Sequence, residues 1–237
     1  MKTSHTKISI TTKQIQEISR KKYFYSIDVS YPQLVNSNVQ NSLDHVNNLI
    51  AEHVIDKVKC FRDKFVPLDV ELSEVLKETY EIESLIINFN FYLQNSSLLS
   101  WEFIISQNVP GTAHPNSESE TFNYSIPTQS FLQIDDLFGF ESNYLVQLSH
   151  YCRNELFKQT QKDHNLSTDW IKKGTLPNKK NFRKFCLDET GVIIIFDPYC
   201  VGSYSWGRRE VRIPYKRISE SIRENSVLSQ FINSSSP

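Results

Sequence analysis

The hydrophobic positions of the chain follow two periods, one of three to four residues and one of two. The longer period is clearest between residues 38 and 65, where it predicts an amphipathic helix with polar capping candidates at 36–38. A weaker pattern of the same period predicts a second helix over residues 143–162. Each helix is expected to lay its apolar face against a sheet.

Runs with a period of two, or with apolar residues throughout, predict strands over residues 23–31, 81–93, 98–107, 121–126, 182–187, 192–196 and 208–213. The runs 81–93 and 98–107 flank the turn residues 95–97, so we expect a long antiparallel hairpin. Residues 192–196 are all apolar, as expected of a strand buried on both faces. Gly191 is expected to give the turn before that strand its positive φ.

The segments between these elements carry weaker signals. Residues 1–14 are expected to be loosely held, apart from an edge strand at 7–10. Composition and spacing predict one helical turn or loop over 15–22, a loop over 109–120, a short helix or turn over 131–138, an irregular connection over 163–180 and a short helix over 219–231.

The order of these elements predicts an α+β fold. Runs of strands interrupted by single helices favour a mainly antiparallel sheet of about six to eight strands, with both long helices on one face and no βαβ winding. We expect a single domain over residues 15–232, with halves at about 20–110 and 111–218, and a frayed tail at 233–237.

Composition narrows the function classes. The 237 residues carry a net charge of −1, so the chain lacks the positive excess typical of proteins that bind nucleic acid or anionic membranes. It has no run of 18 apolar residues, and we expect no membrane span. The N-terminal sequence lacks the apolar core of a signal peptide, which predicts a cytoplasmic location, or a periplasmic or extracellular one if a leader has been removed. No phosphate loop or other cofactor motif is present, so no cofactor is expected.

Four cysteines leave the redox state open. Cys60, Cys152, Cys186 and Cys200 lie far apart and form no C-x-x-C pair, which argues against a zinc site. Four cysteines allow three disulfide pairings, but reduced cysteines used as small core residues are the favoured interpretation.

The loop 198–209 holds the densest group of aromatic and arginine residues in the chain. Such side chains dominate binding hot spots because they bury a large rigid area and keep a polar group. One hypothesis is that this loop enters the cleft of a partner; the alternative is that Tyr199 and Trp206 cap the edge of a sheet. The candidate contact residues are Tyr199, Ser203, Tyr204, Trp206, Arg208 and Arg209.

The loop 109–120 offers two further candidates, His114 and Asn116. A histidine there would suit a general base or a metal ligand, but spacing fixes no nucleophile or carboxylate beside it. A hydrogen-bonded structural histidine is therefore the favoured interpretation of His114.

Several charged residues allow both a catalytic and a structural interpretation. The acids Asp135 and Asp136, with those near residue 120, would suit a glycosidase pair only at a fixed separation, so solvated charges and a cap on the following turn are favoured. Glu102, placed within an apolar strand, is expected to point to solvent. The basic residues Lys179, Lys180, Arg183 and Lys184 are interpreted as a solvated surface.

Two stretches carry motifs that are known together from one family. The first combines GTAHP, TFNYSI and IDDLF at residues 111–115, 121–126 and 134–138, and the second is PYCVGSYSWGRREVRIPY at 198–215. They resemble the bacterial domain found at the extracellular end of the anti-sigma-V factor RsiV and in association with peptidoglycan deacetylases. The segment 25–50 is also similar, and the resemblance covers roughly residues 20–218.

The resemblance implies a binding function. Family members that act as sensors bind lysozyme and have no chemistry of their own, which implies a non-enzymatic module directed at a protein partner such as a cell-wall hydrolase, for inhibition, immunity or sensing. Two departures stand out: Ser125 to Gln129 replace the usual Asp-x-x-x-Gly turn, and no membrane helix precedes the domain, so anti-sigma activity is not implied. A glycan-binding module and a hydrolase using His114 with nearby acids remain alternatives.

Overall fold

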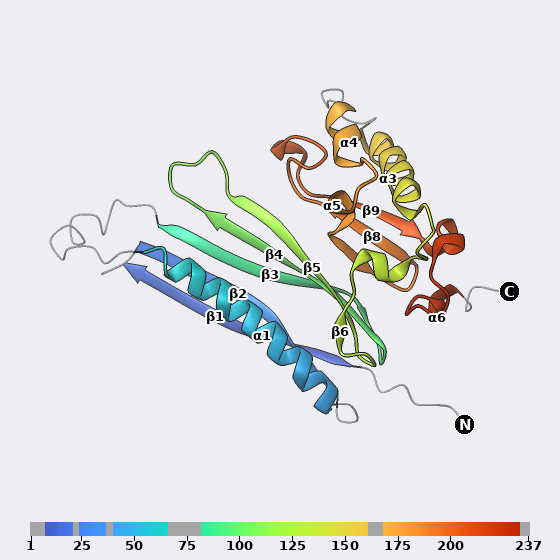
Figure 1. Cartoon of the computed structure of the whole chain (residues 1–237). Helices are drawn as coiled ribbons and strands as arrows, with labels where there is room; N and C mark the ends of the chain where they lie inside the picture. The colour runs from blue at the N-terminus through green and yellow to red at the C-terminus, as the bar shows by residue number, and fades with distance from the viewer. Residues whose placement is uncertain (1–7, 21–23, 37–39, 66–81, 161–167, 233–237) are drawn as a thin grey trace. The chain divides into compact units, whose positions relative to one another are not determined.

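The computed structural model describes residues 8–20, 24–36, 40–65, 82–160 and 168–232 (Figure 1). The chain divides into two compact units, which are described separately: the first comprises Met1–Asn90 and Phe103–Glu118, and the second Phe91–Glu102 and Ser119–Pro237. Its strands form a six-stranded sheet in the order β1-β2-β3-β4-β5-β6 and a three-stranded sheet in the order β7-β8-β9. The predicted α+β class is confirmed, although the strands divide between two sheets.

The elements have the following bounds. The strands are β1 Ser9–Arg20, β2 Phe24–Val35, β3 Glu83–Gln94, β4 Leu98–Asn108, β5 Asn116–Ser125, β6 Ser130–Phe131, β7 Phe185–Leu187, β8 Gly191–Phe196 and β9 Arg209–Pro214. The α-helices are α1 Gln40–Arg62, α3 Tyr144–Thr160, α4 Thr168–Gly174, α5 Lys179–Phe182 and α6 Ser229–Ile232. Short 3₁₀ turns are η1 Ile134–Leu137, η2 Tyr204–Trp206, η3 Tyr215–Arg217 and η4 Ser219–Ser221.

The first unit is built on α1 and the strand before it. The apolar stripe of α1, which includes Val46, Ile50 and Val54, is buried, and the helix packs on β2. The long helix predicted from residues 38–65 is therefore confirmed; positions 37–39 and Pro67 lie outside the described residues. Strand β2 pairs with β3 in parallel, from Tyr25↔Glu83 to Val29↔Ile87. The expectation of no βαβ winding was wrong at this one connection, because a helix between two parallel strands is such a crossover.

Strand β1 replaces the loose segment and helical turn expected near the N-terminus. It pairs with β2 antiparallel along its full length, from Ser9↔Val35 to Arg20↔Phe24. Ile15 and Ile18 are three residues apart, which imitates helical spacing, but in the strand Ile18 is 71% exposed. The prediction for residues 15–22 was therefore wrong where β1 covers them. Strand β2 also continues past Pro32, where the pairing with β3 has already ended.

The second unit contains the three-stranded sheet. Strand β8 pairs antiparallel with β7 on one side and with β9 on the other, and all six of its residues are buried, which confirms the predicted doubly covered strand. Helix α3 confirms the prediction for 143–162 and contacts β9 and α4. The two long helices therefore lie on different sheets, α1 on the six-stranded one and α3 on the three-stranded one.

The turn before β8 is made differently from the prediction. Among the described glycines a positive φ occurs at Gly111 and Gly207, so Gly191 was wrongly expected to have one. A Cβ at Gly191 would lie 2.3 Å from the carbonyl oxygen of Ile213, and this close approach to β9 is what requires glycine. The turn is held by the Asp188 carboxylate, which accepts the backbone N–H of Gly191 at 3.0 Å.

A buried polar clamp explains one motif of the resemblance. Asn123 is 2% exposed, accepts a hydrogen bond from the Ser100 hydroxyl at 2.7 Å and donates to the carbonyl of Phe185 at 2.9 Å. Ser100 in turn accepts the backbone N–H of Leu187 at 2.8 Å. The Phe-Asn strand of the sequence motif thus fixes β7 through side chains buried in the second unit.

Three weaker predictions differ from the structure. The strand expected at 121–126 begins earlier, at Asn116, within the expected loop. The expected connection over 163–180 contains α4 and α5, with 161–167 outside the described residues. The helix expected over 219–231 is instead a 3₁₀ turn and the short helix α6.

Candidate functional site

The loop between β8 and β9 has its tryptophan turned inward. Trp206 is 6% exposed and belongs to the core of the second unit. The guanidinium carbon of Arg209 lies 4.4 Å from the centre of the Trp206 ring, and Arg209 also donates a hydrogen bond to the Trp206 carbonyl. Trp206 and Arg209, two of the candidate contact residues, therefore stabilise the loop by packing within the protein.

Arg208 is also used within the protein. Its guanidinium pairs with Glu102 at 2.5 Å and with Glu210 at 2.6 Å, and donates to the hydroxyls of Tyr92 at 3.2 Å and Ser119 at 3.1 Å. Glu102 is fully buried, so the expectation that it points to solvent was wrong. Arg208 compensates the charge of this carboxylate.

Electrostatics keeps two members of this cluster, Arg208 and Tyr92, each in one charge state. Burial by itself would lower the pKa of Arg208, but Glu102, Glu210 and Tyr92 together raise that pKa above its usual range. Burial, followed by the hydrogen bond to Glu210, raises the pKa of Tyr92 far above its ordinary value. The arginine therefore stays charged and the tyrosine neutral.

Three aromatic side chains of the second unit form an exposed surface. The ring centroids of Trp170 and Tyr199 are 6.1 Å apart with an interplanar angle of 40°, and those of Tyr199 and Tyr204 are 6.0 Å apart with an angle of 37°. Trp170 is 38% exposed, Tyr199 is 54% exposed and Tyr204 is half-buried. We call these three rings the aromatic surface. Two of them were candidates from the sequence.

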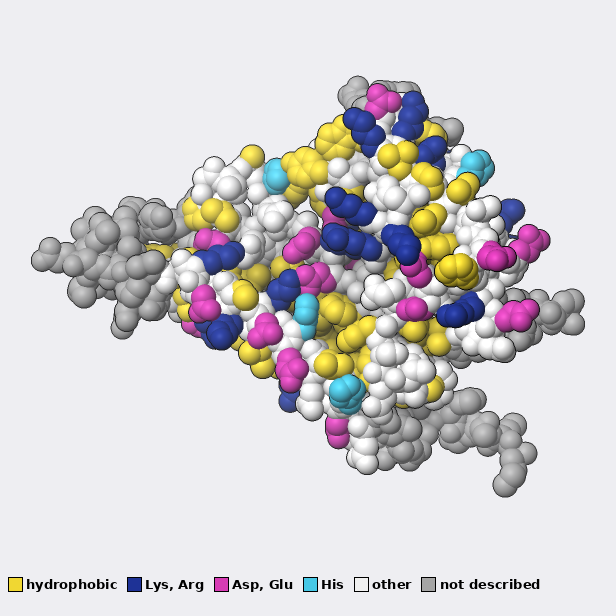
Figure 2. Space-filling view, in the orientation of Figure 1, with side chains coloured by type: hydrophobic (Ala, Val, Ile, Leu, Met, Phe, Trp, Pro, Cys, Tyr) yellow, Lys and Arg dark blue, Asp and Glu magenta, His cyan; other side chains and the backbone are white. Residues whose placement is uncertain are grey.

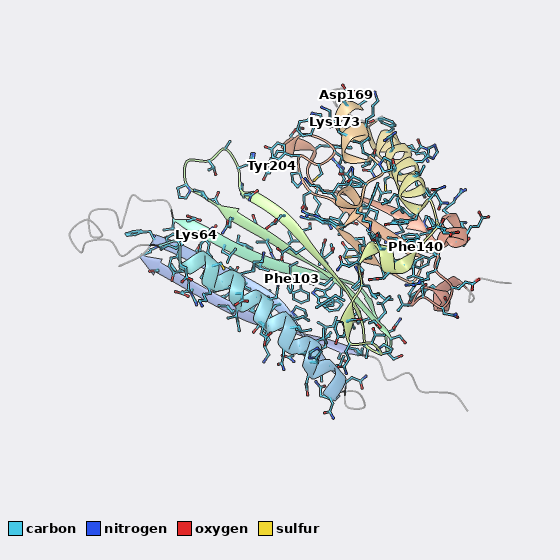
Figure 3. All side chains as sticks on the ribbon, in the orientation of Figure 1. Lys64, Phe103, Phe140, Asp169, Lys173 and Tyr204 are labelled. Carbon is cyan, nitrogen blue, oxygen red and sulfur yellow. The ribbon has the colours of Figure 1, made fainter. Side chains whose placement is uncertain are left out.

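Trp170 was missed because its segment was expected to be an irregular connection. It lies on α4 beside the buried Ile171, so the two neighbouring apolar residues point to different sides of the helix. Figure 3 places Tyr204 on the loop beside α4, the helix that carries Asp169 and Lys173. Tyr199 itself has a φ of +70°, uncommon for a non-glycine residue and often found at functional sites.

A small basic pocket lies beside these two elements, between α5, β8 and the residues that follow each of them. Its cavity volume is about 160 Å³, and its lining comprises Gly174, Lys180, Asn181, Arg183, Lys184, Ile195, Phe196 and Cys200. Gly174 ends α4, one helical turn after Trp170, and Cys200 follows Tyr199 directly. Figure 2 shows dark blue Lys and Arg side chains gathered over the α5 region, close to yellow side chains of the α4 region. The basic cluster interpreted from the sequence as plain surface thus borders a cavity.

The remaining contact candidates lie on the surface. Ser203 is exposed, and its hydroxyl lies 2.9 Å from that of Ser205. In the first unit, Asn116 is exposed at the start of β5, and His114 is half-buried with Nδ1 3.1 Å from the carbonyl oxygen of Pro115.

The acids expected to be structural have structural contacts. The Asp136 carboxylate accepts the backbone N–H of Gln133 at 2.7 Å and caps η1, as predicted. Asp135 accepts hydrogen bonds from Lys179 and Tyr144. Burial tends to raise the pKa of Asp135, but Lys179 and Tyr144 outweigh it and lower the pKa below its ordinary value.

The cysteines form no disulfide among themselves. All four cysteines are free, and Cys152 and Cys186 are buried. Within the described residues, no group of three or more His, Cys, Asp or Glu side chains is placed to bind a metal ion. None of the described helices is long and apolar enough to cross a membrane.

A family model matches the part of the chain that carries the aromatic surface and the basic pocket. Residues 135–216 match the family described as "Protein of unknown function (DUF3298)". This segment covers about a third of the chain. The family match supports the resemblance to the wider domain family, but its description does not mention RsiV.

The chain is similar to a curated protein and to solved structures of DUF3298-family proteins. Peptidoglycan-N-acetylmuramic acid deacetylase PdaC of Bacillus subtilis (strain 168) is 33% identical over 117 residues, which are 49% of this chain and 25% of that protein. The chain therefore spans about a quarter of the length of this relative. A DUF3298-family protein of Bacteroides fragilis NCTC 9343 has a TM-score of 0.71 at 16% identity and covers 97% of this chain and 100% of its own. Another, from Pseudomonas aeruginosa PAO1, has a TM-score of 0.60 at 15% identity, with 92% and 96% covered. At such identities the structures establish a shared fold.

Proposed function

We propose that this protein is a non-enzymatic binding module whose contact surface is the aromatic surface of Trp170, Tyr199 and Tyr204, and whose partner is a protein, a peptidoglycan hydrolase such as lysozyme. The observation that carries the proposal is that three large rings stand side by side at the surface. Binding there would inhibit or sense the hydrolase, or give immunity to it.

The arrangement of the rings favours a protein partner over a sugar chain. Neighbouring ring centres are about 6 Å apart and the rings are tilted by 37–40°, so they offer one continuous contact area instead of separate flat platforms. Tyr and Trp bury much area at little entropic cost, which is why they are frequent in hot spots. The buried Trp206 beneath the loop reduces the ordering that binding would require.

The partner class is supported from two sides. The sequence motifs resemble a family whose sensors bind lysozyme, and PdaC, which is 33% identical over half of the chain, is named as a peptidoglycan deacetylase. For the module itself, the groups considered for hydrolysis are engaged locally, since Asp136 caps η1 and His114 lies against the carbonyl of Pro115. A non-enzymatic role is therefore the proposal.

Binding to a panel of purified lysozyme-type hydrolases, measured by biolayer interferometry, tests this function. We expect Trp170→Ala and Tyr204→Ala each to weaken the binding of a responding hydrolase by at least about tenfold, as truncation of a hot-spot ring does. Phe140→Ala is the matched control, because Phe140 is a fully exposed aromatic residue in the loop before α3. If no hydrolase binds, or if all three variants bind like the wild type, the proposed function is wrong.

One observation favours a second candidate function. The basic pocket beside the rings would suit the carboxylates of muramyl peptides, with the rings stacking on sugars. A soluble muropeptide panel in the same assay distinguishes this glycan-binding function from the protein-binding one, because the two predict different binders.

A further inference from the structure

The basic pocket concentrates positive charge that the protein itself uses only in part. Lys184 is paired with Asp197, which is 8% exposed and also accepts the backbone N–H of Ser119 at 3.0 Å. Lys180 and Arg183 are exposed, and neither has an ion pair with a carboxylate of the described residues. Two cations therefore face the cavity without a counter-charge from the described part of the chain.

Close backbone contacts and hydrogen bonds fix the positions of the segments that line the pocket. A Cβ on Gly174 would lie 2.1 Å from the carbonyl oxygen of Cys200, so the end of α4 rests directly on the loop. The Asn181 side chain donates to the carbonyls of Lys173 at 3.2 Å and Leu176 at 3.0 Å, which fixes α5 to the end of α4. Lys180 on α5 and Arg183 directly after it are thus carried by a segment that hydrogen bonds hold beside the cavity.

The remaining groups that face the cavity add no negative charge. Ile195 and Phe196 form its apolar floor and belong to the buried strand β8. Burial, followed by the charge of Asp197, raises the pKa of the Cys200 thiol above its ordinary value, so this side chain stays neutral near pH 7. An anion entering the pocket meets cations and apolar carbon without a competing thiolate.

We propose that the basic pocket is an anion subsite of the contact surface, which receives a carboxylate from an acidic segment of the protein partner while the rings pack beside it. This inference rests on the proposed function, because Gly174 of α4 and Cys200 of the loop line the pocket, and the same two elements carry the three rings. Charge complementarity identifies the occupant: Lys and Arg donors bind carboxylates through charge-assisted hydrogen bonds. The partner's contact face is therefore acidic, and this selects among hydrolases by surface charge.

A pair of dipeptides tests the subsite directly. The isotope-labelled full chain is titrated with acetyl-Asp-Glu-amide and with its uncharged counterpart acetyl-Asn-Gln-amide, and amide shifts are followed by NMR. We expect saturable shifts around Gly174, Lys180 to Lys184 and Cys200 with the acidic peptide, and none there with the uncharged one.

Two double variants of equal composition provide the control. Lys180→Ala/Arg183→Ala should weaken binding of the acidic peptide by about tenfold, whereas Lys216→Ala/Arg217→Ala, in the exposed turn η3, should leave it within about twofold. Equal binding by the wild type and the Lys180/Arg183 variant would overturn the subsite. If the Ala double variant proves unfolded by circular dichroism, Lys180→Gln/Arg183→Gln replaces it.

The hydrolase assay separates this inference from the proposed function. If Trp170→Ala and Tyr204→Ala lose hydrolase binding while Lys180→Ala/Arg183→Ala keeps it, the subsite is wrong and the proposed function stands. If the Lys180/Arg183 variant loses binding to muropeptides and no hydrolase binds, the pocket serves a glycan and the assignment of a protein carboxylate is overturned. The supporting result is loss of hydrolase binding in both kinds of variant, most strongly for acidic hydrolases.

Discussion

At the scale of single residues, the structure assigns opposite roles to similar side chains. Trp206 lies in the core and Trp170 lies on the surface, and of two consecutive arginines Arg208 is bound to a buried carboxylate while Arg209 stacks on Trp206. Residue type alone predicts neither placement. Glu102 is the strongest case, because a fully buried carboxylate is tolerated only when it is paired and hydrogen-bonded.

The Arg208–Glu102 pair gives a stability prediction. Arg208→Ala should lower the free energy of unfolding by about 3 kcal/mol, because it leaves the Glu102 carboxylate buried without its counter-charge. The double variant Arg208→Met/Glu102→Gln removes both charges and should recover most of that loss. Urea unfolding measures both values.

Arg212 provides the control for this experiment. It pairs with Asp188 but is half exposed, so Arg212→Ala should cost less than about 1 kcal/mol. Equal losses for Arg208→Ala and Arg212→Ala would contradict the assigned role of the buried pair.

At the scale of elements, side-chain contacts fix strands and helices whose local signals are weak. In the first unit, Glu17 of β1 accepts a hydrogen bond from Tyr25 of β2 at 2.5 Å and forms an ion pair with Arg62 of α1. Glu17 thereby joins three elements, and it is half-buried while its neighbour Ile18 is exposed.

The contacts of Glu17 make the stability of the first unit depend on pH. The hydrogen bond from Tyr25, then Arg62, lowers the pKa of Glu17 below its ordinary value of 4.5. A lowered pKa in the folded state means that the stabilisation is fully present above pH 4.5 and is lost as the pH falls through the folded value. Comparing urea unfolding at about pH 7 and about pH 3.5, Glu17→Gln should lose less stability on acidification than the wild type, by under about 1 kcal/mol because the pair is partly exposed. An identical pH profile for both proteins would refute this role.

Gly174 gives a prediction about the contact between α4 and the loop. Alanine is intrinsically better than glycine in a helix by about 1 kcal/mol, but its Cβ would meet the backbone oxygen of Cys200 at 2.1 Å. Because backbone cannot yield as a side-chain end does, we expect Gly174→Ala to destabilise the protein by about 1–2 kcal/mol and to weaken partner binding. Gly139→Ala, whose Cβ would have its nearest neighbour at 3.9 Å, should leave the melting temperature almost unchanged. A more stable Gly174→Ala variant would disprove the close contact.

At the scale of the whole molecule, the small net charge does not reveal that positive side chains gather at one pocket. The chain carries −1 overall, yet Lys180 and Arg183 face one cavity without a carboxylate partner among the described residues. A small net charge provides little long-range attraction, so the pocket is expected to act mainly once the partner has arrived.

Salt dependence tests this distribution. Raising the salt from about 0.05 to about 0.5 M should weaken wild-type binding of an acidic partner several-fold, because partly exposed ion pairs are screened. The Lys180→Ala/Arg183→Ala variant should respond less, and the Lys216→Ala/Arg217→Ala variant should respond like the wild type. Equal salt dependence in all three would show that the pocket does not carry the interaction.

The elements with strong local patterns were predictable. Helix α1, the β3–β4 hairpin, the buried strand β8 and the alternating strand β9 each bury a face that their own sequence defines. Strand β1 and helix α4 were not, because β1 has mostly polar side chains and α4 has only seven residues. Their structure depends on neighbours, and a periodicity argument cannot include those neighbours.

The sequence by itself determined the α+β class, the long helices, the absence of a basic footprint and the loop in which Tyr199 and Tyr204 lie. These properties follow from local periodicity and composition, which the chain carries in any conformation. Only the tertiary structure decided that Trp206 lies inside, that Trp170 joins the tyrosines, that Glu102 is buried against Arg208 and that Lys180 and Arg183 face one cavity. The reason is physical: the exposure and partners of a side chain depend on residues distant in the sequence, and only folding brings those residues together.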